Sequence, residues 1–370
     1  MIPILYEPNT TKFNTNNGIG LLTDALTCYV SEELNGAFEL EMTYPVHGIH
    51  FLSIVLDGII KAAPEEQATT LEPFRIYHIS EPINGIVTIN ARHLTYMLNF
   101  VPVMPISSAE RTATEALTAI KAVAAETCPV NFATDITTRA TFERKEPQGM
   151  RSVLGGIEGS FLDVYGGEFK WSWPNVQVLK ARGEDRGFAI DYGKNLVGFL
   201  RDSTTDGIIT GICPYVRNTA EGGAETILTL TEKVIESQYA SLFPFRRTVC
   251  VDLSDKFTGN NGAVTEEQLR TEAQKYINSN AVGVPRISTD ISFVETKDGR
   301  DYAIDYANTV HLGDTVTVNF AMYNLSVKEK VVKTVYNVLK DRYESATIGK
   351  QMDSLASTIY DISNGTFNSY

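Results

Sequence analysis

The residues that could carry nucleophilic chemistry in this 370-residue chain are four cysteines and five histidines. A catalytic cysteine needs a histidine beside it, which takes the thiol proton and later returns it. The candidates are Cys213 and Cys250 with His311. Apolar residues flank each of these cysteines, a context typical of buried strands. We therefore expect no catalytic residue, and we interpret all four cysteines, including Cys28 and Cys128, as buried small hydrophobes.

Metal and disulfide signals are equally sparse. The cysteines are scattered without CxxC spacing, which argues against a zinc site and against a disulfide framework. His47 and His50 lie three positions apart, but no third ligand stands nearby. In the segment 251–262, VDLSDKFTGNNG, Lys256 occupies a position where a calcium loop needs an oxygen ligand, so we interpret it as a surface turn. The sequence predicts no metal ligand.

Phosphate-binding and paired-carboxylate signals also fail. The segment 187–194, GFAIDYGK, has five residues between its glycines where a phosphate loop has four, and Asn195 stands where Ser or Thr would hold magnesium. Adjacent carboxylates, such as Glu32-Glu33 and Glu65-Glu66, do not converge on one reacting atom, so we expect them in solvated loops. We therefore predict no cofactor and no cofactor-binding residue.

Composition limits the classes of protein that remain. The net charge of −13 and the lack of a basic stripe exclude groove binding of nucleic acid, although DNA could pass an acidic wall without adhering. No apolar run reaches the roughly 18 residues of a membrane span. The N-terminus lacks the basic and apolar regions of a secretory signal, so we expect synthesis and folding in the cytosol.

Strand patterns dominate the first hundred residues. Asn84-Gly85 lies between two strand-like runs within 74–100 and predicts a hairpin with a type I′ turn, followed by about two turns of helix. Apolar and polar residues alternate from Phe38 to Tyr44, as in a half-buried strand. The stretch Phe51 to Ile60 is a further strand candidate.

Helical patterns mark two later segments of the chain. Ser107 with Glu110 resembles a capping box before a helix, and a second amphipathic segment extends from Val153 to Leu162, interrupted by glycines. The segment 168–180 predicts a hairpin carrying Trp171 and Trp173 on one strand face, more consistent with core than with binding.

The second half of the chain repeats this plan. Strand-like segments at 189–216 are followed by a helix from Thr265 to about Asn280, with Thr265 and Gln268 as its capping box. A β meander over 310–349 follows. Near the C-terminus, four apolar residues show heptad spacing over about one and a half heptads, consistent with a coiled coil or with a single packed helix: Met352, Leu355, Ile359 and Ile362.

Three patches together carry a resemblance: ARHLTYMLN at 91–99, DYGKNLVGFLRDSTTDGIITGICPYV at 191–216, and HLGDTVTVNF with VVKTVYNVLKDRYESATIG at 311–349. Their order and spacing resemble the N-terminal region of phage minor structural proteins, the tail-tip or baseplate hub family also called tail-associated lysin or prophage endopeptidase tail protein. The resemblance extends to about Gly349. None of the patches is a chemical motif.

The resemblance implies a β-rich α+β fold with two small antiparallel β-barrel-like domains, each with an α/β insertion. The expected domains are a first barrel at 1–102, an insertion at 103–185, a second barrel at 186–240 and 305–349, a second insertion at 241–304, and a helical connector at 350–370.

The function that the resemblance implies is structural, and because the residues show no catalytic set, we expect that the chain is not an enzyme. We expect a homotrimeric tail-tip or baseplate hub in the virion, continuing or closing the tail tube, with the distal tail protein and the tail tube or tape-measure proteins as partners. DNA would pass through its lumen without specific binding. The alternatives are a peptidoglycan hydrolase, or a carbohydrate-binding adhesion module suggested by the aromatic content of 10%.

Overall fold

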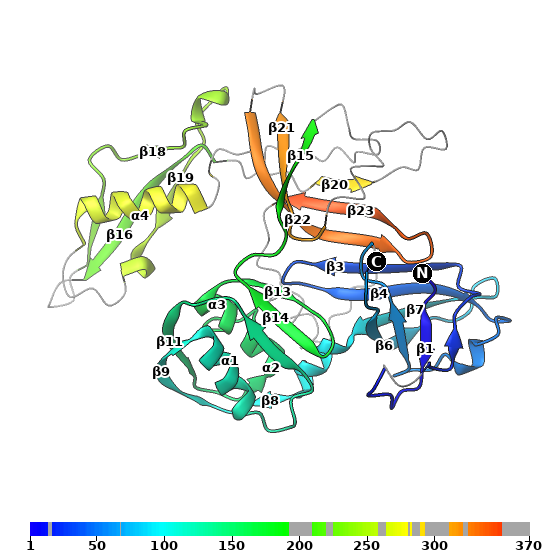
Figure 1. The fold of residues 1–370 in the computed structure, drawn as a ribbon. Helices are drawn as coiled ribbons and strands as arrows, with labels where there is room; N and C mark the ends of the chain where they lie inside the picture. The colour runs from blue at the N-terminus through cyan, green and yellow to red at the C-terminus, as the bar shows by residue number, and fades with distance from the viewer. Residues whose placement is uncertain are drawn as a thin grey trace. The chain divides into compact units, whose positions relative to one another are not determined.

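The computed structural model describes residues 1–13, 17–66, 68–191, 209–219, 225–257, 264–279, 282, 289–292, 311–320 and 325–349. The chain forms two compact units (Figure 1). Unit 1 contains residues 1–200 and 288–370, and unit 2 contains residues 201–287. The structure confirms the β-rich α+β class that the sequence predicts.

Among the described residues of unit 1, the main element is a twelve-stranded sheet. Its N-terminal strands are β1 (Ile4–Tyr6), β2 (Gly20–Leu21), β3 (Thr27–Glu33), β4 (Phe38–Pro45), β5 (Ile59–Ala62), β6 (Glu72–Ile79) and β7 (Ile86–His93). Its C-terminal strands are β15 (Asp185–Asp191), β20 (Thr289–Ser292), β21 (Thr315–Phe320), β22 (Leu325–Asn337) and β23 (Arg342–Gly349). The main path runs β15-β21-β22-β3-β4-β7-β6-β5-β1-β2. The predicted meander near the C-terminus is thus confirmed as β21, β22 and β23.

One strand pair joins the two ends of the chain. β3 and β22 are antiparallel, with Glu33 opposite Lys333 and Tyr29 opposite Asn337. Figure 1 shows them as a blue strand beside an orange one. Strands from the N-terminal and C-terminal parts of the chain are therefore hydrogen bonded into a single sheet.

The alternation predicted for the first strands is confirmed. On β4, Phe38, Leu40, Met42 and Tyr44 are buried, while the residues between them are more exposed. Because successive side chains of a strand point to opposite faces, this pattern gives the sheet one apolar and one polar face. The apolar face begins a core that continues into the following region of the chain.

The central hairpin is confirmed as well. Asn84 and Gly85 both have positive φ, 54° and 76°, as a type I′ turn requires, and β6 and β7 pair on either side. A 3₁₀ helix, η2 (Leu94–Phe100), follows β7 at the predicted place. The strand expected from Phe51 to Ile60 is wrong for most of its length: Phe51–Ser53 is a short 3₁₀ helix, η1, and β5 begins only at Ile59.

The segment after η2 folds as an α/β region within unit 1. Its strands are β8 (Pro102–Val103), β9 (Ile106–Thr112), β10 (Asn131–Thr134), β11 (Arg139–Arg144), β12 (Gln148–Gly149), β13 (Glu168–Lys170) and β14 (Asn175–Leu179). Its helices are α1 (Ala113–Ala122), α2 (Met150–Leu154) and α3 (Phe161–Tyr165). β13 and β14 form the predicted hairpin.

Two helix predictions in this region need correction. Ser107 lies on β9, and the capping box of α1 is formed by Thr112 with Glu115, because the strand continues to Thr112 before the chain turns. The amphipathic segment from Val153 to Leu162 is two short helices, α2 and α3, because the glycines between them do not continue the helix.

The tryptophan prediction is partly confirmed. Trp171 is buried and stacks on Phe169 with ring centroids 4.3 Å apart. Trp173 is half-buried against the core. Both follow the end of β13, so they do not share a strand face as the sequence suggests.

In the part of unit 2 that the structure describes, a small sheet packs against the α-helix α4. β16 (Gly211–Thr219) pairs with β17 (Glu225–Thr229), β18 (Ile235–Glu236) and β19 (Thr248–Asp252). Helix α4 (Glu266–Ser279) packs Leu269, Ala273 and Ile277 against Ile212 and Val216 of β16. Short 3₁₀ helices occur at Ala240–Leu242 and Ser254–Phe257.

The predicted start of α4 is confirmed. The backbone N–H of Thr265 donates to Gln268 at 2.9 Å, and the N–H of Gln268 donates to the Thr265 hydroxyl at 3.3 Å. The limits of all the predicted domains stay predictions. The coiled-coil spacing over 352–362 lies outside the described residues.

Candidate functional site

The cysteines and histidine that the sequence nominates belong to different units. Cys213 and Cys250 lie on β16 and β19 of unit 2, and His311 belongs to unit 1. The His311 ring lies 3.3 Å from the Tyr343 hydroxyl and 3.9 Å from the Glu65 carboxylate. These contacts place His311 in a polar cluster of unit 1. That the chain has no catalytic residue stays a prediction.

Burial of the cysteines is correctly predicted only in part. Cys28 is buried in the core, and burial raises the pKa of its thiol. Cys128 and Cys213 are half-buried, and Cys250 is exposed. The prediction is wrong for Cys250 because its strand turns this side chain away from α4, and apolar neighbours in the sequence do not reveal which face a residue takes.

The other segments that the sequence nominates belong to regular elements or local hydrogen-bond networks of the fold. His50 lies at the start of η1. Asp252, in the nominated calcium segment, accepts hydrogen bonds from the N–H of Ser254 and from Arg217, both at 3.0 Å. Residues 187–191 of the nominated phosphate-loop segment belong to strand β15 (Asp185–Asp191). Among the described residues, no group of three His, Cys, Asp or Glu side chains could hold a metal ion.

One of the two adjacent carboxylate pairs lies on a strand and not in a loop. Glu32 and Glu33 lie on β3. Glu32 is buried and accepts a hydrogen bond from Arg182 Nη1 at 2.6 Å, whereas Glu33 pairs with Lys333 at 2.9 Å. The expectation of a solvated loop is therefore wrong for this pair, because a buried arginine supplies the charge that Glu32 needs.

Arg182 is the centre of a buried ionic cluster that joins distant parts of unit 1. The Arg182 guanidinium forms an ion pair with Glu32 on β3 and donates a hydrogen bond to the Phe169 carbonyl at 3.0 Å. The backbone N–H of Arg182 donates to Glu168 on β13. Glu168 also pairs with Lys330 on β22. Burial alone would lower the pKa of Arg182, but the neighbouring carboxylates, Glu32 above all, raise it, so the guanidinium stays charged.

A second buried cluster connects the hairpin to the α/β region. Glu72 accepts hydrogen bonds from Ser172 Oγ at 2.7 Å and from Trp173 N–H at 2.9 Å, and lies 3.0 Å from His93 Nε2. Burial by itself raises the pKa of Glu72, but these hydrogen bonds outweigh it and hold the pKa below its ordinary value. His93 is fully buried and its ring stacks on Phe38 at 4.5 Å. No substrate could reach this histidine, so the cluster is structural.

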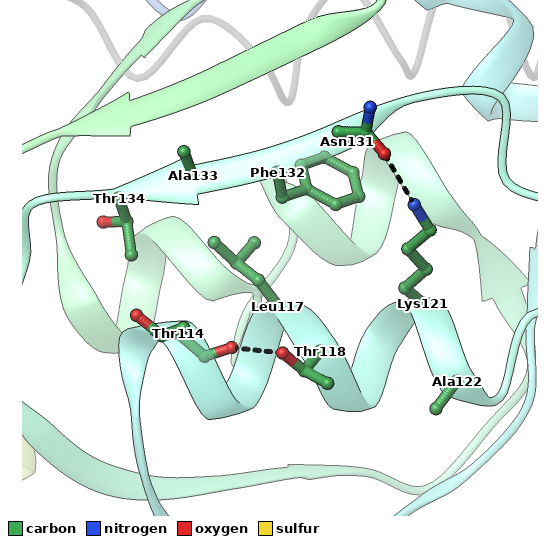
Figure 2. A pocket seen from close by; sticks show the side chains of 9 residues that line it. All are labelled: Thr114, Leu117, Thr118, Lys121, Ala122, Asn131, Phe132, Ala133 and Thr134. Carbon is green, nitrogen blue, oxygen red and sulfur yellow. Dashed lines mark hydrogen bonds between the residues drawn. The ribbon is translucent and has the colours of Figure 1, made fainter.

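A hollow of about 350 Å³ lies between α1 and β10 (Figure 2). Leu117 and Phe132 lie between the helix and the strand, and Lys121 donates to the Val130 carbonyl at 2.8 Å and to Asn131 at 3.3 Å. Thr118 donates to the Thr114 carbonyl. Because these polar side chains have partners within the fold, the hollow shows no group set for catalysis.

The polar face of the large sheet is the candidate functional surface. On β3, β4, β7 and β22 it presents hydroxyls, amides and charges at the positions between buried residues. Arg92 lies 3.2 Å from Glu39, and the hydroxyls of Thr27 and Thr43 are 2.7 Å apart. Lys333 pairs with Glu33 on the same face. Both of these cations have a carboxylate partner, so they offer little to attract phosphate.

Sequence reasoning had no way to find these clusters. Glu32 and Arg182 are 150 positions apart, and Glu72 and Ser172 are 100 positions apart. Neither spacing forms a motif. The only available signal was the alternation of β4, which predicts the polar face but not the strands beside it.

Solved structures of phage tail proteins share this fold. The crystal structure of prophage tail protein gp18 from Listeria monocytogenes has a TM-score of 0.62 with 13% identity, over 98% of this chain and 99% of that chain. The 43 kDa tail protein of prophage MuSo2 from Shewanella oneidensis has a TM-score of 0.52 with 12% identity, over 95% and 99%. The chain therefore has the fold of prophage tail proteins.

The sequence gives an independent match. Residues 184–359 match the model of the family described as prophage endopeptidase tail. The resemblance to phage tail-associated proteins is thus confirmed. No curated protein matches the chain. Among the described residues, none of the helices is both long enough and apolar enough to cross a membrane.

Proposed function

We propose that this chain is a structural tail-tip or baseplate hub protein of a phage or prophage, and not an enzyme. Three copies form a ring that continues or closes the tail tube and connects it to the host-contacting parts. The observation that carries this proposal is the structural likeness to prophage tail protein gp18 of Listeria monocytogenes, which covers 98% of this chain. The family match over 184–359 supports it.

The polar face of the large sheet, on β3, β4, β7 and β22, faces the lumen of this ring. Its side chains are hydroxyls, amides and paired charges, and the chain as a whole carries a net charge of −13. A wall of this kind offers DNA no unpaired row of cations, so DNA slides past without adhering. Glu41 adds an exposed carboxylate to the same face.

The experiment that tests the ring is light scattering on the purified chain over a concentration series, followed by electron microscopy of the fractions. A mass three times that of the chain, with ring-shaped particles whose channel is lined by Glu39 and Glu41, is the expected result. A monomer at every concentration, also in the presence of the distal tail protein, would contradict the proposal. A ring with this sheet face turned outward would contradict the lumen assignment alone.

A cell-wall hydrolysis assay tests the proposal that the chain is not an enzyme. Purified chain incubated with peptidoglycan should release no soluble fragments. The matched variant is His311→Ala, which removes the histidine that a cysteine mechanism would need. Fragments released by the natural chain and lost in this variant would show that the chain is a hydrolase.

A further inference from the structure

Two thiols of unit 2 lie directly opposite each other on neighbouring strands. β16 and β19 are parallel, and their register pairs Cys213 with Cys250. Neighbouring strands lie about 4.8 Å apart. The Cα atoms of disulfide-bonded cysteines usually lie about 4.4–6.8 Å apart. The backbone therefore already holds the two cysteines at a separation that suits a disulfide.

Both side chains point away from the core of unit 2. Ile212 of β16 is fully buried in the cluster that includes α4. Because side chains alternate along a strand, Cys213 takes the opposite face. Cys250 is exposed and Val251, the next residue of β19, packs against the core. The two thiols thus share the face that α4 does not cover.

A second register pair on the same face supports this placement. Tyr215 lies opposite Asp252, two residues further along each strand. Arg217 Nε lies 3.0 Å from Asp252 Oδ2, and the Arg217 guanidinium lies 6.0 Å from the Tyr215 ring centroid. The Arg217 side chain can approach both residues only if Tyr215 and Asp252 project to the same side of the sheet. Cys213 and Cys250 lie two residues before them on the same strands. Because side chains alternate along a strand, the two cysteines project to that side as well.

The two thiols differ in their readiness to react. Burial raises the pKa of Cys213, and the neighbouring Cys250 raises it further, while Lys233 lowers it. Cys250 is exposed and open to a small reagent. In unit 1, Cys28 is fully buried, and Cys128 Sγ lies 3.5 Å from the Val130 carbonyl and 3.6 Å from Met150 Sδ. The unit 2 pair is therefore the place where an oxidant acts first.

We propose that Cys213 and Cys250 form an intramolecular disulfide by exchange with a small disulfide such as oxidised glutathione. The Cys250 thiolate attacks one glutathione sulfur and releases a first glutathione thiolate, leaving a mixed disulfide. The Cys213 thiolate then attacks the Cys250 sulfur and releases the second. Two protein thiols are oxidised, and their two electrons and two protons convert one oxidised glutathione into two reduced molecules.

The bond would fasten a strand that is otherwise weakly held. Among the described strands, β19 pairs with β16 alone. A disulfide between them keeps β19 in the sheet when unit 2 opens. Cytosolic thiols stay reduced, whereas released proteins meet oxidising surroundings. We expect the two cysteines to be reduced during assembly and oxidised in the released tail, and this order of events rests on the proposed function. The formation of the disulfide itself does not depend on that function.

Thiol counting on the full chain tests the proposal. The purified chain is incubated with oxidised glutathione or with a reductant, unfolded, and treated with N-ethylmaleimide before mass spectrometry. We expect four blocked thiols in the reduced chain and two in the oxidised chain, with a cross-linked peptide joining Cys213 to Cys250. Oxidation should also raise the melting temperature of unit 2 by roughly 8–30 °C.

Matched variants separate this bond from other oxidation products. Cys128→Ser should keep the cross-linked peptide and the rise in melting temperature, and Cys250→Ser should lose both. Four blocked thiols after oxidation, a stable glutathione adduct on Cys250, or a covalent dimer through Cys250 would each overturn the proposal. If a variant fails to fold, the number of blocked thiols in the natural chain still shows whether the disulfide forms.

Discussion

The sheet of unit 1 and the sheet of unit 2 are stabilised in different ways. In unit 1, strands from both ends of the chain pair through β3 and β22, and the ion pair of Arg182 with Glu32 is buried beside them. In unit 2, all the described strands and α4 come from one stretch of chain, and the ion pairs are exposed.

The ion pairs show this difference most clearly. Arg270 on α4 lies 2.7 Å from Glu232 and 3.1 Å from Glu266, and its hydrogen bond to Glu232 lowers the pKa of that carboxyl to about 2. Solvent screens the charges of Arg270, Glu232 and Glu266, so these ion pairs contribute little to the stability of unit 2. A buried pair has no such screening, and removing one partner leaves the other charge uncompensated. Unit 1 therefore depends on distant partners and unit 2 on its local core.

The largest predicted effect is that of Arg182→Ala. It leaves Glu32 buried without its cation, whereas Glu168 keeps its ion pair with Lys330, so the free energy of unfolding of unit 1 should fall by about 3–5 kcal/mol. Denaturant unfolding of the purified variant measures the change. Arg270→Ala is the matched control and should leave the stability of unit 2 almost unchanged. Equal losses in the two variants would contradict the comparison.

Next in size is Leu269→Ala in the core of unit 2. Leu269 is fully buried between α4 and the small sheet, so its truncation should cost about 2–5 kcal/mol. If the units unfold separately, calorimetry should show a lower transition for unit 2 and an unchanged one for unit 1. Leu40→Ala in the large sheet should give the reverse. A single transition that moves in both variants would show that the two sheets unfold together.

The buried carboxylate Glu72 gives a smaller, pH-dependent effect. Glu72→Gln keeps the shape but loses the charge-assisted hydrogen bonds to His93, Ser172 and Trp173, and should cost about 1.5–3 kcal/mol.

The folded-state pKa of Glu72 lies below its ordinary value of 4.5. Its contribution to stability is therefore complete above pH 4.5 and is lost as the pH falls through the folded-state pKa. Unfolding measured between pH 7 and pH 3 should show a smaller acid loss in Glu72→Gln than in the natural chain. Parallel curves would exclude Glu72 as a source of the acid sensitivity.

The smallest predicted effect concerns the turn of the central hairpin. At Gly85, φ is +76° and a Cβ would meet only Val46 Cγ2 at 3.8 Å, so Gly85→Ala tests backbone conformation without a steric clash. The left-handed conformation should cost about 1–2 kcal/mol. Gly85→Asn is the control, because asparagine tolerates this conformation and should cost less. Equal losses would point to a cause other than φ.

Sequence reasoning predicted the local elements well and the clusters not at all. The alternation over Phe38 to Tyr44 predicts β4, and Thr265 with Gln268 predicts the start of α4, because each signal involves residues within a few positions of one another. The same kind of signal misled at Ser107, where a capping-box pattern lies on strand β9. Pairing with β11 fixed that segment as a strand.

The sequence by itself determined the β-rich class, the Asn84-Gly85 hairpin and the resemblance to phage tail proteins, since composition, turn residues and patch order are properties of the chain alone. Only the tertiary structure decided that β3 pairs with β22, that Arg182 is buried beside Glu32, and that Cys213 faces Cys250. Each of these contacts joins residues distant in sequence. Their energy comes from burial and register, which exist only once the strands have assembled.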